Sequence, residues 1–589
     1  MPLSSRLLAA GFAGLVLTAT AVVPASAAPV SPGRTVAAGD VTAAATSART
    51  SATEARRVGG VKTPDLRWYS CYGWAQCATA EVPLDYDNPY GEQTTVALLR
   101  VKATDQKHRI GSLFVNPGGP GASATTFALL SSGVLSSSLL RRFDIVGMDP
   151  RGIGSSDNIA CFKDTRRQTN ALKGMNVAFP VGKKQTKAYL ASVRKLAVGC
   201  STTGRRLAGA MSTAEVARDM EVMRRAVGDK KLNYLGFSYG TALGQYYANM
   251  FPDRFRTIAV DGVINPRSWV GSAKTGNTIQ DVRLGSAKGA ERALARILEL
   301  CDLAGTTKCS FAAGDPVKRF AALAARLKAK PITVQGTTIT YATFIGAVLS
   351  SLYGEQAPED VTGIAADLWT LTAENASQAD VTAALARVRR NRAFAYDNSL
   401  DAYAGVMCTD GRHPATSSSW PAKVAKASKR APYFGAAWAW ASAPCARDIW
   451  TVHDEDAYTG PFTRRSRNTV LVVGSYWDPA TNYYEAVGSA GQLGNARLLS
   501  SDNFGHTAYG SSACVDTAID NYLLHKALPT TGKVCTAAAP FATANPAASL
   551  TTATAALDLT TVTKEQIAAQ GRPAADAAKQ RPPVTRGPF

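Results

Sequence analysis

One stretch of the chain, "KLNYLGFSYGTALGQYYANMFP", constrains the fold more than any other. Its first part, KLNYLGF, is a short apolar run typical of a buried strand, and its second part, GTALGQYYANMFP, predicts a helix that ends at Pro252. Between them, Gly236 and Gly240 flank Ser238. A sharp turn from strand to helix strains the backbone at the serine, and side chains at the two glycine positions would collide with neighbouring elements. This context predicts a nucleophile elbow; a serine that only caps the helix is the alternative interpretation.

Strands and helices alternate on both sides of this turn. Residues 214–228 have the apolar spacing of a helix, and between 266 and 461 the strand signal gives way to helical segments such as GAERALARILELCDLAG. Apolar strands that alternate with helices predict a largely parallel sheet covered on both faces. We therefore expect an α/β fold with a mostly parallel sheet and a helical cap inserted between its two halves. The expected strands are TTVALLRVKAT (94–104), GSLFVNPGG (111–119), FDIVGMDPRG (143–152), TIAVDGV (257–263) and NTVLVVGSYWD (468–478).

The two ends of the chain differ in composition from its middle. Arg6, the apolar run 7–23 and an A-x-A site predict a signal peptide over residues 1–27. Residues 28–62 are rich in Ala, Thr, Ser and Arg and predict a pro-segment or a disordered leader, and residues 536–589 predict a loosely packed tail. The remaining predicted divisions are the first half of the core at 63–265, the cap at 266–461 and the second half of the core at 462–535.

The charge and hydropathy patterns narrow the possible partners. The net charge is +21, but the basic residues are scattered and form no Lys/Arg block with interleaved aromatic residues, which argues against nucleic acid as a partner. No later stretch reaches about 18 uninterrupted apolar residues, which argues against insertion into a membrane. We expect a soluble, secreted, monomeric protein.

The chain contains ten cysteines, and in an exported protein these favour disulfides over metal ligation. There is no CxxC pair and there are only five histidines, so we expect no zinc site, and we expect no other metal or cofactor. The spacing does not choose among the possible pairings, but the sequential one is the simplest because each bridge then closes a local loop. It joins Cys71–Cys77, Cys161–Cys200, Cys301–Cys309, Cys408–Cys445 and Cys514–Cys535.

A nucleophilic serine needs a base, and a histidine after Ser238 is expected in this fold. His506 lies in "SSDNFGHTAYG", a loop after the strand-like ARLLS, and Gly505 beside it allows close approach. His413 and His453 are its rivals, whereas His525 lies within a predicted surface helix. We predict His506 as the base.

The base in turn needs an acid to orient it. Asp478 follows the buried strand TVLVVGSYW and precedes Pro479, so it lies on a loop at the end of that strand. Asp261 also follows a strand and could serve in a variant arrangement, and Asp502 is more typical of a turn cap. We predict Asp478, which leaves room for one helix and one strand before His506.

Two backbone N–H groups should form the oxyanion hole. One belongs to Tyr239, directly after the nucleophile, and the other should come from "NPGGPGAS", where Gly118 and Gly119 let the backbone approach. Phosphate binding is a weaker interpretation of this glycine loop because no GK[ST] follows.

These segments together resemble the secreted bacterial tripeptidyl aminopeptidases, which have the α/β-hydrolase fold and are related to prolyl aminopeptidases. The resemblance is carried by "NPGGPGAS", "FDIVGMDPRGIGSSD", the elbow segment through "IAVDGV", "GVMCTDGRHP", Asp478 and His506, and it runs from Trp68 to Cys535. It implies a serine exopeptidase that releases short peptides from a free N-terminus, with Ser238, Asp478 and His506 at the triad positions.

An exopeptidase of this kind must bind a charged amine, and a carboxylate does this well. Asp410, in the "CTD" segment that matches the family motif, is the first candidate. Glu355, in "SLYGEQ", is the second; a solvated loop carboxylate is the alternative interpretation. Two other functions share these features. A secreted esterase or lipase would use the same triad without an amine-binding acid, and a silent binding protein would keep the fold alone.

Overall fold

The computed structural model describes residues 48–334, 337–372 and 398–542. The predicted signal peptide, most of the predicted leader and the tail from residue 543 lie outside these residues. Part of the predicted leader is described and is folded. Ala52–Gly59 forms helix α1, which is capped by Ser51 and buries Glu54 in an ion pair with Arg218 at 2.8 Å. This part of the leader is therefore folded against the core because its helix has both a cap and a buried charged partner.

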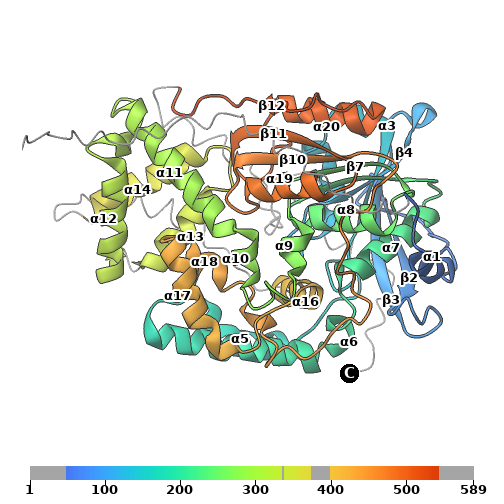
Figure 1. Ribbon diagram of the computed structural model, residues 1–589, viewed down its shortest axis with the longest axis horizontal. Helices are drawn as coiled ribbons and strands as arrows, with labels where there is room; N and C mark the ends of the chain where they lie inside the picture. The colour runs from blue at the N-terminus through green and yellow to red at the C-terminus, as the bar shows by residue number, and fades with distance from the viewer. Residues whose placement is uncertain (1–47, 335–336, 373–397, 543–589) are drawn as a thin grey trace, which may run out of the picture. The chain divides into compact units, whose positions relative to one another are not determined.

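Within the described residues, the core is a ten-stranded sheet with the order β1-β2-β3-β5-β4-β6-β7-β10-β11-β12 (Figure 1). The first three strands and β5 pair antiparallel, and the remaining pairs are parallel. The predicted strands are all present. Their bounds, with the two strands of a separate hairpin, are β1 Tyr69–Cys71, β2 Ala75–Pro83, β3 Gln93–Val101, β4 Gly111–Asn116, β5 Phe143–Met148, β6 Leu232–Phe237, β7 Phe255–Asp261, β8 Ile332–Val334, β9 Thr337–Ile339, β10 Val470–Trp477, β11 Ala496–Phe504 and β12 Val534–Cys535.

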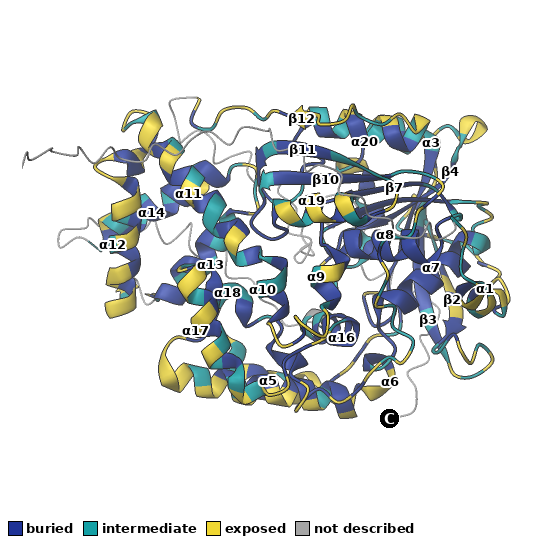
Figure 2. Cartoon of the chain, viewed as in Figure 1, coloured by how far each residue is buried: buried dark blue, intermediate teal, exposed yellow. Residues whose placement is uncertain are grey.

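Helices cover both faces of this sheet, so its central strands are buried throughout (Figure 2). Side chains alternate along each strand. Leu113 and Leu235 pack with α2, α3 and α20, whereas Phe114 and Tyr234 pack with α7, α8 and α19. The expected α/β-hydrolase fold is confirmed. The core helices are α1 Ala52–Gly59, α2 Ala124–Leu129, α3 Ser137–Arg142, α7 Thr213–Ala226, α8 Tyr239–Met250, α19 Tyr483–Gln492 and α20 Ala513–His525.

The predicted cap region is mainly helical, but the structure adds two features to it. A hairpin, β8–β9, lies where the prediction contained no strand. Helices α5 and α6, which precede the cap in sequence, pack against α16 (Figure 1), and α5 also contacts the short turn Ala443–Cys445 and packs with α4. The cap side of the molecule thus takes helices from two parts of the chain. These helices are α4 Thr165–Leu172, α5 Gly182–Thr202, α6 Arg205–Ala208, α9 Pro266–Val270, α10 Gln280–Leu284, α11 Ser286–Ala304, α12 Pro316–Ala329, α13 Tyr341–Ser351, α14 Ala357–Leu371, α16 Ser399–Asp410, α17 Trp420–Arg430 and α18 Gly435–Ala439.

All ten cysteines pair in the sequential pattern, and none is free. Two bridges lie in the cap. Cys301–Cys309 joins the last turn of α11 to the segment after it, and Cys408–Cys445 joins the end of α16 to the turn that α5 contacts. Among the helices of the described ranges, none has the length and apolar character needed to cross a bilayer.

Candidate active site

Ser238 lies at the junction of β6 and α8, as the sequence predicts. Its backbone has φ 53° and ψ −122°, a left-handed conformation that a residue with a side chain adopts only under strain. Although Ser238 occupies the N-cap position of α8, its side chain makes no capping hydrogen bond. The interpretation of Ser238 as a helix cap is therefore wrong. The strained turn fixes the position of the hydroxyl, and the hydroxyl does not cap the helix.

The glycines around Ser238 are required by close backbone contacts. A Cβ at Gly236 would lie 2.5 Å from the carbonyl oxygen of Gly240, and one at Gly240 would lie 2.6 Å from that of Asn116. On the opposite side, a Cβ at Gly118 would lie 2.8 Å from the Tyr239 nitrogen. The glycine-rich loop after β4 therefore lies directly against the elbow.

His506 and Asp478 meet at the carboxyl ends of β11 and β10. The Nδ1 atom of His506 lies 2.9 Å from Oδ2 of Asp478 and 3.1 Å from Oδ1. Asp478 is 1% exposed, and the His506 side chain is 12% exposed. Because an ionised carboxylate only accepts hydrogen bonds, Nδ1 carries the proton and Nε2 keeps its lone pair. This pairing leaves His506 able to act as a base.

Asp478 is itself held by its own loop. Its Oδ1 accepts from the N–H groups of Ala480 and Thr481 at 2.8 Å, and its Oδ2 accepts from Thr481 Oγ1 at 2.8 Å. Thr481 Oγ1 also lies 3.4 Å from His506 Nδ1. These contacts fix the carboxylate plane and with it the orientation of the imidazole.

Asp261, the other acid considered for this role, accepts hydrogen bonds from the loop that carries His506. Its Oδ2 accepts from the N–H groups of Ala508 and Tyr509 at 2.9 and 2.8 Å, just beyond the histidine. The backbone of Asp261 also contacts the serine, because Ser238 N–H donates to the Asp261 backbone carbonyl at 3.1 Å. Asp261 thus links the two loops, and Asp478 makes the contact with His506.

The other rivals lie elsewhere in the structure. His413 is buried with Nε2 3.0 Å from the Met407 carbonyl, and burial lowers its pKa to about 3. His453 is exposed, and His525 is exposed at the end of α20. Asp502 accepts from the backbone N–H of Ala537.

Ser238 follows β6 and His506 follows β11, and β7 and β10 lie between these strands in the sheet. A Cβ at Gly262, the residue after Asp261, would lie 3.3 Å from Cε1 of His506. Within the described residues, no hydrogen bond joins Ser238 Oγ to His506, and the imidazole instead contacts Asp478 and Thr481. Such bonds are often long in a free enzyme and tighten when substrate binds.

The candidate oxyanion hole next to Ser238 draws its donors from the start of α8 and from the glycine loop after β4. Tyr239 is the first residue of α8, where N–H groups have no partner within the helix. Gly118 N–H, however, donates to Oδ1 of Asn116 at 2.9 Å, so this amide is already engaged. The geometry therefore favours Tyr239 and Gly119 as the two donors, with Gly118 needed for close approach.

The electrostatics of His506 predict the pH dependence of activity. Burial lowers the pKa of His506, but the charge of Asp478, its hydrogen bond and the charge of Asp261 raise it by more, so the pKa lies above its ordinary 6.5. A general base must be neutral, so kcat/KM should fall on the acid side with an apparent pKa above 6.5. The measurement is a pH profile of kcat/KM with a substrate that does not titrate in this range.

A companion measurement assigns that pKa to the pair. The chain has five histidines, so their ring signals can be followed individually by NMR. In Asp478→Asn the signal of His506 should titrate at lower pH, because the charge that raises its pKa is gone. An acid limb at or below the ordinary histidine value, or a titration unmoved in Asp478→Asn, would contradict this assignment.

A cap loop touches the histidine. The backbone N–H of His506 donates to the backbone carbonyl of Tyr353 at 3.0 Å, and the centroids of the Tyr353 and His506 rings lie 5.1 Å apart. A Cβ at Gly505 would lie 3.0 Å from the Gly354 carbonyl oxygen. Glu355, the next residue in this loop, is exposed. Tyr353 and Gly354 therefore pack against the loop of His506, and the exposed Glu355 is the next residue along the chain.

Asp410 is placed differently from the prediction. It is 3% exposed at the end of α16, and its oxygens accept from Thr213 N–H at 2.6 Å and from Trp269 Nε1–H at 2.8 Å. Burial raises its pKa to about 6, although these hydrogen bonds act to lower it. Both oxygens of Asp410 therefore already accept hydrogen bonds from protein donors.

Sequence reasoning missed a second carboxylate near the same cap loop. Asp281, in α10, is 4% exposed and accepts from Ser442 Oγ at 2.8 Å. Burial raises the pKa of Asp281 to about 6, and the negative charge of Asp281 contributes to raising the pKa of Tyr353. Helix α10 ends at Gly285, whose carbonyl accepts from Asn482 in the Asp478 loop at 3.2 Å. No sequence signal marks Asp281, because an acid in a short helix is normally solvated.

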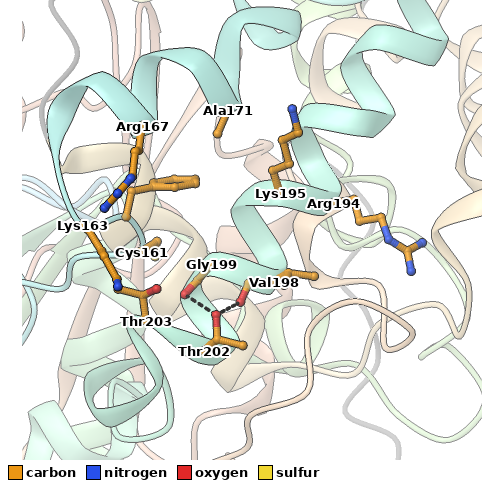
Figure 3. A pocket seen from close by; sticks show the side chains of 11 residues that line it. Cys161, Lys163, Arg167, Ala171, Arg194, Lys195, Val198, Gly199, Thr202 and Thr203 are labelled. Atoms are coloured by element: carbon orange, nitrogen blue, oxygen red, sulfur yellow. Dashed lines mark hydrogen bonds between the residues drawn. The ribbon is translucent and has the colours of Figure 1, made fainter.

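A separate cavity of about 520 Å³ lies between α4 and α5. Figure 3 shows Lys163 and Arg167 on one side of it and Arg194 and Lys195 on the other. None of the predicted site residues lines this cavity, so it plays no part in the chemistry described above.

One group of acids has the spacing of a metal site. Oxygens of Glu215, Asp454 and Asp456 lie within 4.8 Å of one another. Arg218 pairs with Glu215 at 2.6 Å and with Asp456 at 2.9 Å, and Arg151 pairs with Glu215 at 3.0 Å. The cluster is thus part of an ion-pair network in which arginines take the place of a cation.

Comparison with known proteins agrees with this geometry. Residues 111–275 match the family model of the alpha/beta hydrolase fold, and residues 431–535 match that of TAP-like proteins. Over 484 residues the chain is 31% identical to a tripeptidyl aminopeptidase of Streptomyces coelicolor, covering 80% of this chain and 84% of that protein. The chain belongs to the tripeptidyl aminopeptidase family.

Other members of the family carry different names. The chain is 33% identical over 494 residues to carboxylesterase B of Mycobacterium tuberculosis, covering 81% of this chain and 91% of that one. It is 30% identical over 489 residues to serine protease Hip1 of the same species, covering 79% and 88%. The chain is therefore a serine hydrolase, and the resemblance stated from its sequence motifs is confirmed.

Proposed function

We propose that this serine hydrolase is a secreted exopeptidase that cleaves peptide bonds near a free N-terminus and releases tripeptides or other short N-terminal units. Relatives named tripeptidyl aminopeptidase and serine protease support the peptidase activity. Five disulfides support an oxidising, extracellular location.

In the proposed reaction, Ser238 Oγ attacks the scissile carbonyl while Nε2 of His506 takes its proton. Asp478 keeps Nδ1 protonated and stabilises the imidazolium that forms. The oxyanion accepts hydrogen bonds from the N–H groups of Tyr239 and Gly119. His506 then gives the proton to the leaving amine, and water hydrolyses the acyl-enzyme by the same steps.

The observation that carries the substrate class is the contact between the Tyr353 loop and His506. Glu355 is two residues after Tyr353, whose backbone carbonyl accepts a hydrogen bond from the backbone N–H of His506. A carboxylate there can pair with the α-ammonium of a short N-terminal segment that is held under the cap. The nearby charge of Asp281 supports the same preference for a cation.

A carboxylesterase is the second candidate, because a relative at 33% identity bears that name. It would use Ser238, His506 and Asp478 in the same way. It would have no need of an amine-binding carboxylate. The two functions therefore differ in what Glu355 does.

The test compares Glu355→Gln with the wild type on a chromogenic tripeptide amide and on a small neutral ester. A hydrogen bond to a charged group contributes about 1.5–3 kcal/mol, so kcat/KM for the free-amine peptide should fall at least about tenfold. The ester brings no charge to that end of the site, and its hydrolysis should not change.

Glu299→Gln is the matched control, because Glu299 is an exposed cap glutamate paired with Arg296 at 2.9 Å on the surface of α11. It should leave both activities unchanged. If Glu355→Gln loses both activities equally, Glu355 has a structural role. If it loses neither, the amine is bound elsewhere, and Asp281→Asn becomes the decisive variant.

A further inference from the structure

We propose that Asp410 is a positioning residue that holds Tyr239, and with it the amide next to Ser238, through a buried hydrogen-bond chain. The inference rests on the proposed role of Ser238 as the nucleophile. It replaces the expectation that Asp410 binds the substrate amine, and it gives the buried carboxylate a task within the reaction.

The chain runs from Tyr239 to Asp410 through Thr213. Thr213 N–H donates to Oδ1 of Asp410 at 2.6 Å, and the Thr213 hydroxyl donates to Oδ2. The Tyr239 hydroxyl lies 2.6 Å from Thr213 Oγ1. Thr213 has a single hydroxyl proton and gives it to the carboxylate, so the Tyr239 O–H must donate to Thr213. The carboxylate thus sets the direction of both bonds.

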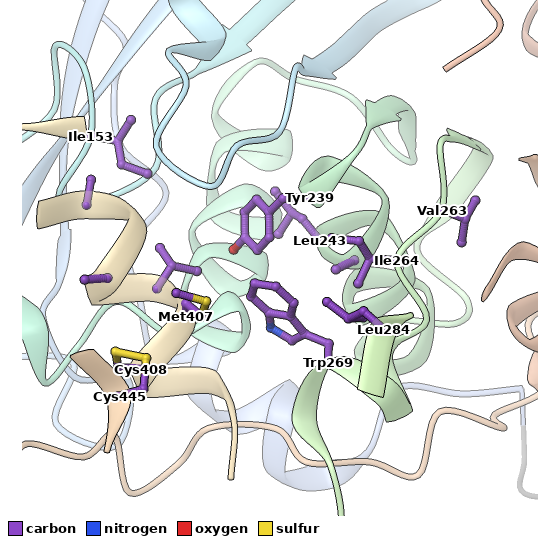
Figure 4. Close-up of a cluster of buried hydrophobic side chains, with 14 of the residues drawn as sticks. Ile153, Tyr239, Leu243, Val263, Ile264, Trp269, Leu284, Met407, Cys408 and Cys445 are labelled. Atoms are coloured by element: carbon purple, nitrogen blue, oxygen red, sulfur yellow. A yellow bond between two sulfur atoms is a disulfide. The ribbon is translucent and has the colours of Figure 1, made fainter. Parts of the chain in front are cut away.

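Trp269 packs over the same residues. Its Nε1–H donates to Oδ2 of Asp410 at 2.8 Å, and its ring lies 5.6 Å from that of Tyr239. Figure 4 shows the two rings side by side, with Met407 and the Cys408–Cys445 bridge on the α16 side. Tyr239 is 0% exposed and Trp269 is 2% exposed, so no water competes for these bonds.

The position of this chain in the fold makes it relevant to catalysis. A strained φ such as that of Ser238 persists only when the surroundings over-determine it, and Tyr239 is the next residue. Thr213 begins α7 of the core, whereas Asp410 ends α16 and Trp269 lies in α9, both in the cap. The cap therefore holds the side chain of Tyr239, whose backbone N–H is the proposed oxyanion donor.

The first test is Asp410→Asn, assayed on a free-amine peptide amide and on a small neutral ester. Three donors converge on Asp410, and an amide offers only one acceptor oxygen, so at least one donor loses its partner. Displacing an oxyanion donor should lower kcat by about 10-fold to 100-fold for both substrates, with little change in KM. An amine-binding role would instead affect the peptide alone.

Three further variants separate positioning from folding. Thr213→Val and Tyr239→Phe each break the chain at one bond, and both should lower kcat. Thr213→Ser keeps the hydroxyl and should retain most of kcat. The loss in Asp410→Asn combined with Tyr239→Phe should be less than the two single losses together, because both act on one chain. If Asp410→Asn fails to fold, the Thr213 and Tyr239 variants decide.

Asp401→Asn is the matched control. Asp401 lies on the same helix, is 1% exposed and accepts from Cys161 N–H at 3.2 Å and from the Gln168 side-chain amide at 3.3 Å. It should change thermal stability without changing kcat. Equal loss of kcat in Asp401→Asn and Asp410→Asn would overturn the proposal, as would an Asp410→Asn variant with wild-type kcat.

Labelling with a serine-reactive phosphonate keeps the two claims separate. If the wild type is not labelled at Ser238, the proposed function fails. If Ser238 is labelled and the Asp410, Thr213 and Tyr239 variants all keep wild-type kcat, only the positioning role fails.

Discussion

Ser238→Ala is expected to lower kcat by at least about 10³ while the fold stays intact. The hydroxyl has no capping bond to lose, and the left-handed backbone at this position is imposed by its neighbours. The variant should therefore unfold at a temperature close to that of the wild type. The measurement is kcat on a chromogenic peptide amide, together with identification by mass spectrometry of the serine that a phosphonate labels.

Ser201→Ala is a suitable control for this variant. Ser201 is 3% exposed, and its hydroxyl accepts from Thr451 N–H at 3.0 Å, far along the chain from the elbow. Its loss should cost stability and leave kcat unchanged. A Ser238→Ala variant with near-normal activity, or a label on another serine, would disprove the assignment of the nucleophile.

Asp478→Asn is expected to lower kcat by about 10⁴, because an amide at this position no longer holds the imidazole in the tautomer that the reaction needs. The expectation follows from the 2.9 Å contact with His506 Nδ1. The loop donors from Ala480 and Thr481 would hold the amide close to the position of the carboxylate, so the histidine remains and only its proton arrangement changes.

Asp261→Asn distinguishes the two acids. Asp261 accepts only backbone N–H groups near the histidine, so its loss should loosen that loop and lower kcat by much less than the loss of Asp478. The comparison is kcat for both variants at a pH where His506 is neutral. If Asp261→Asn has the larger effect, the roles of the two acids are reversed.

The sheet and the elbow could be predicted because their signals are local. Apolar runs bounded by glycines identify buried strands without reference to the rest of the chain, and the collisions expected at Gly236 and Gly240 depend on the turn itself. The sequential disulfides were only the simplest of the possible pairings, because each closes a local loop and the spacing alone chooses none of them. The contact between Asp478 and His506 could also be expected from position, because Asp478 comes directly after a buried strand.

The cap could not be predicted to the same depth. Helical spacing indicates helices but not which of them meet, so the packing of α5 against α16 and the contact of Tyr353 with His506 are visible only in the structure. Asp410 shows the limit most clearly. The sequence around Asp410 predicted a residue that binds the substrate amine. Its hydrogen-bond partners, Thr213 and Trp269, lie 197 and 141 residues away in the chain. Whether a carboxylate faces a pocket or a protein donor is decided by such distant contacts.

The most direct test of this account is the rate of cleavage of one chromogenic tripeptide amide with its N-terminus free and with it acetylated. A site that reads an α-ammonium through Glu355 should cleave the free peptide with a kcat/KM at least about tenfold higher, since acetylation removes the charge that the carboxylate binds. Equal cleavage of the two peptides would contradict the exopeptidase proposal and favour an esterase or endopeptidase that uses the same Ser238, His506 and Asp478.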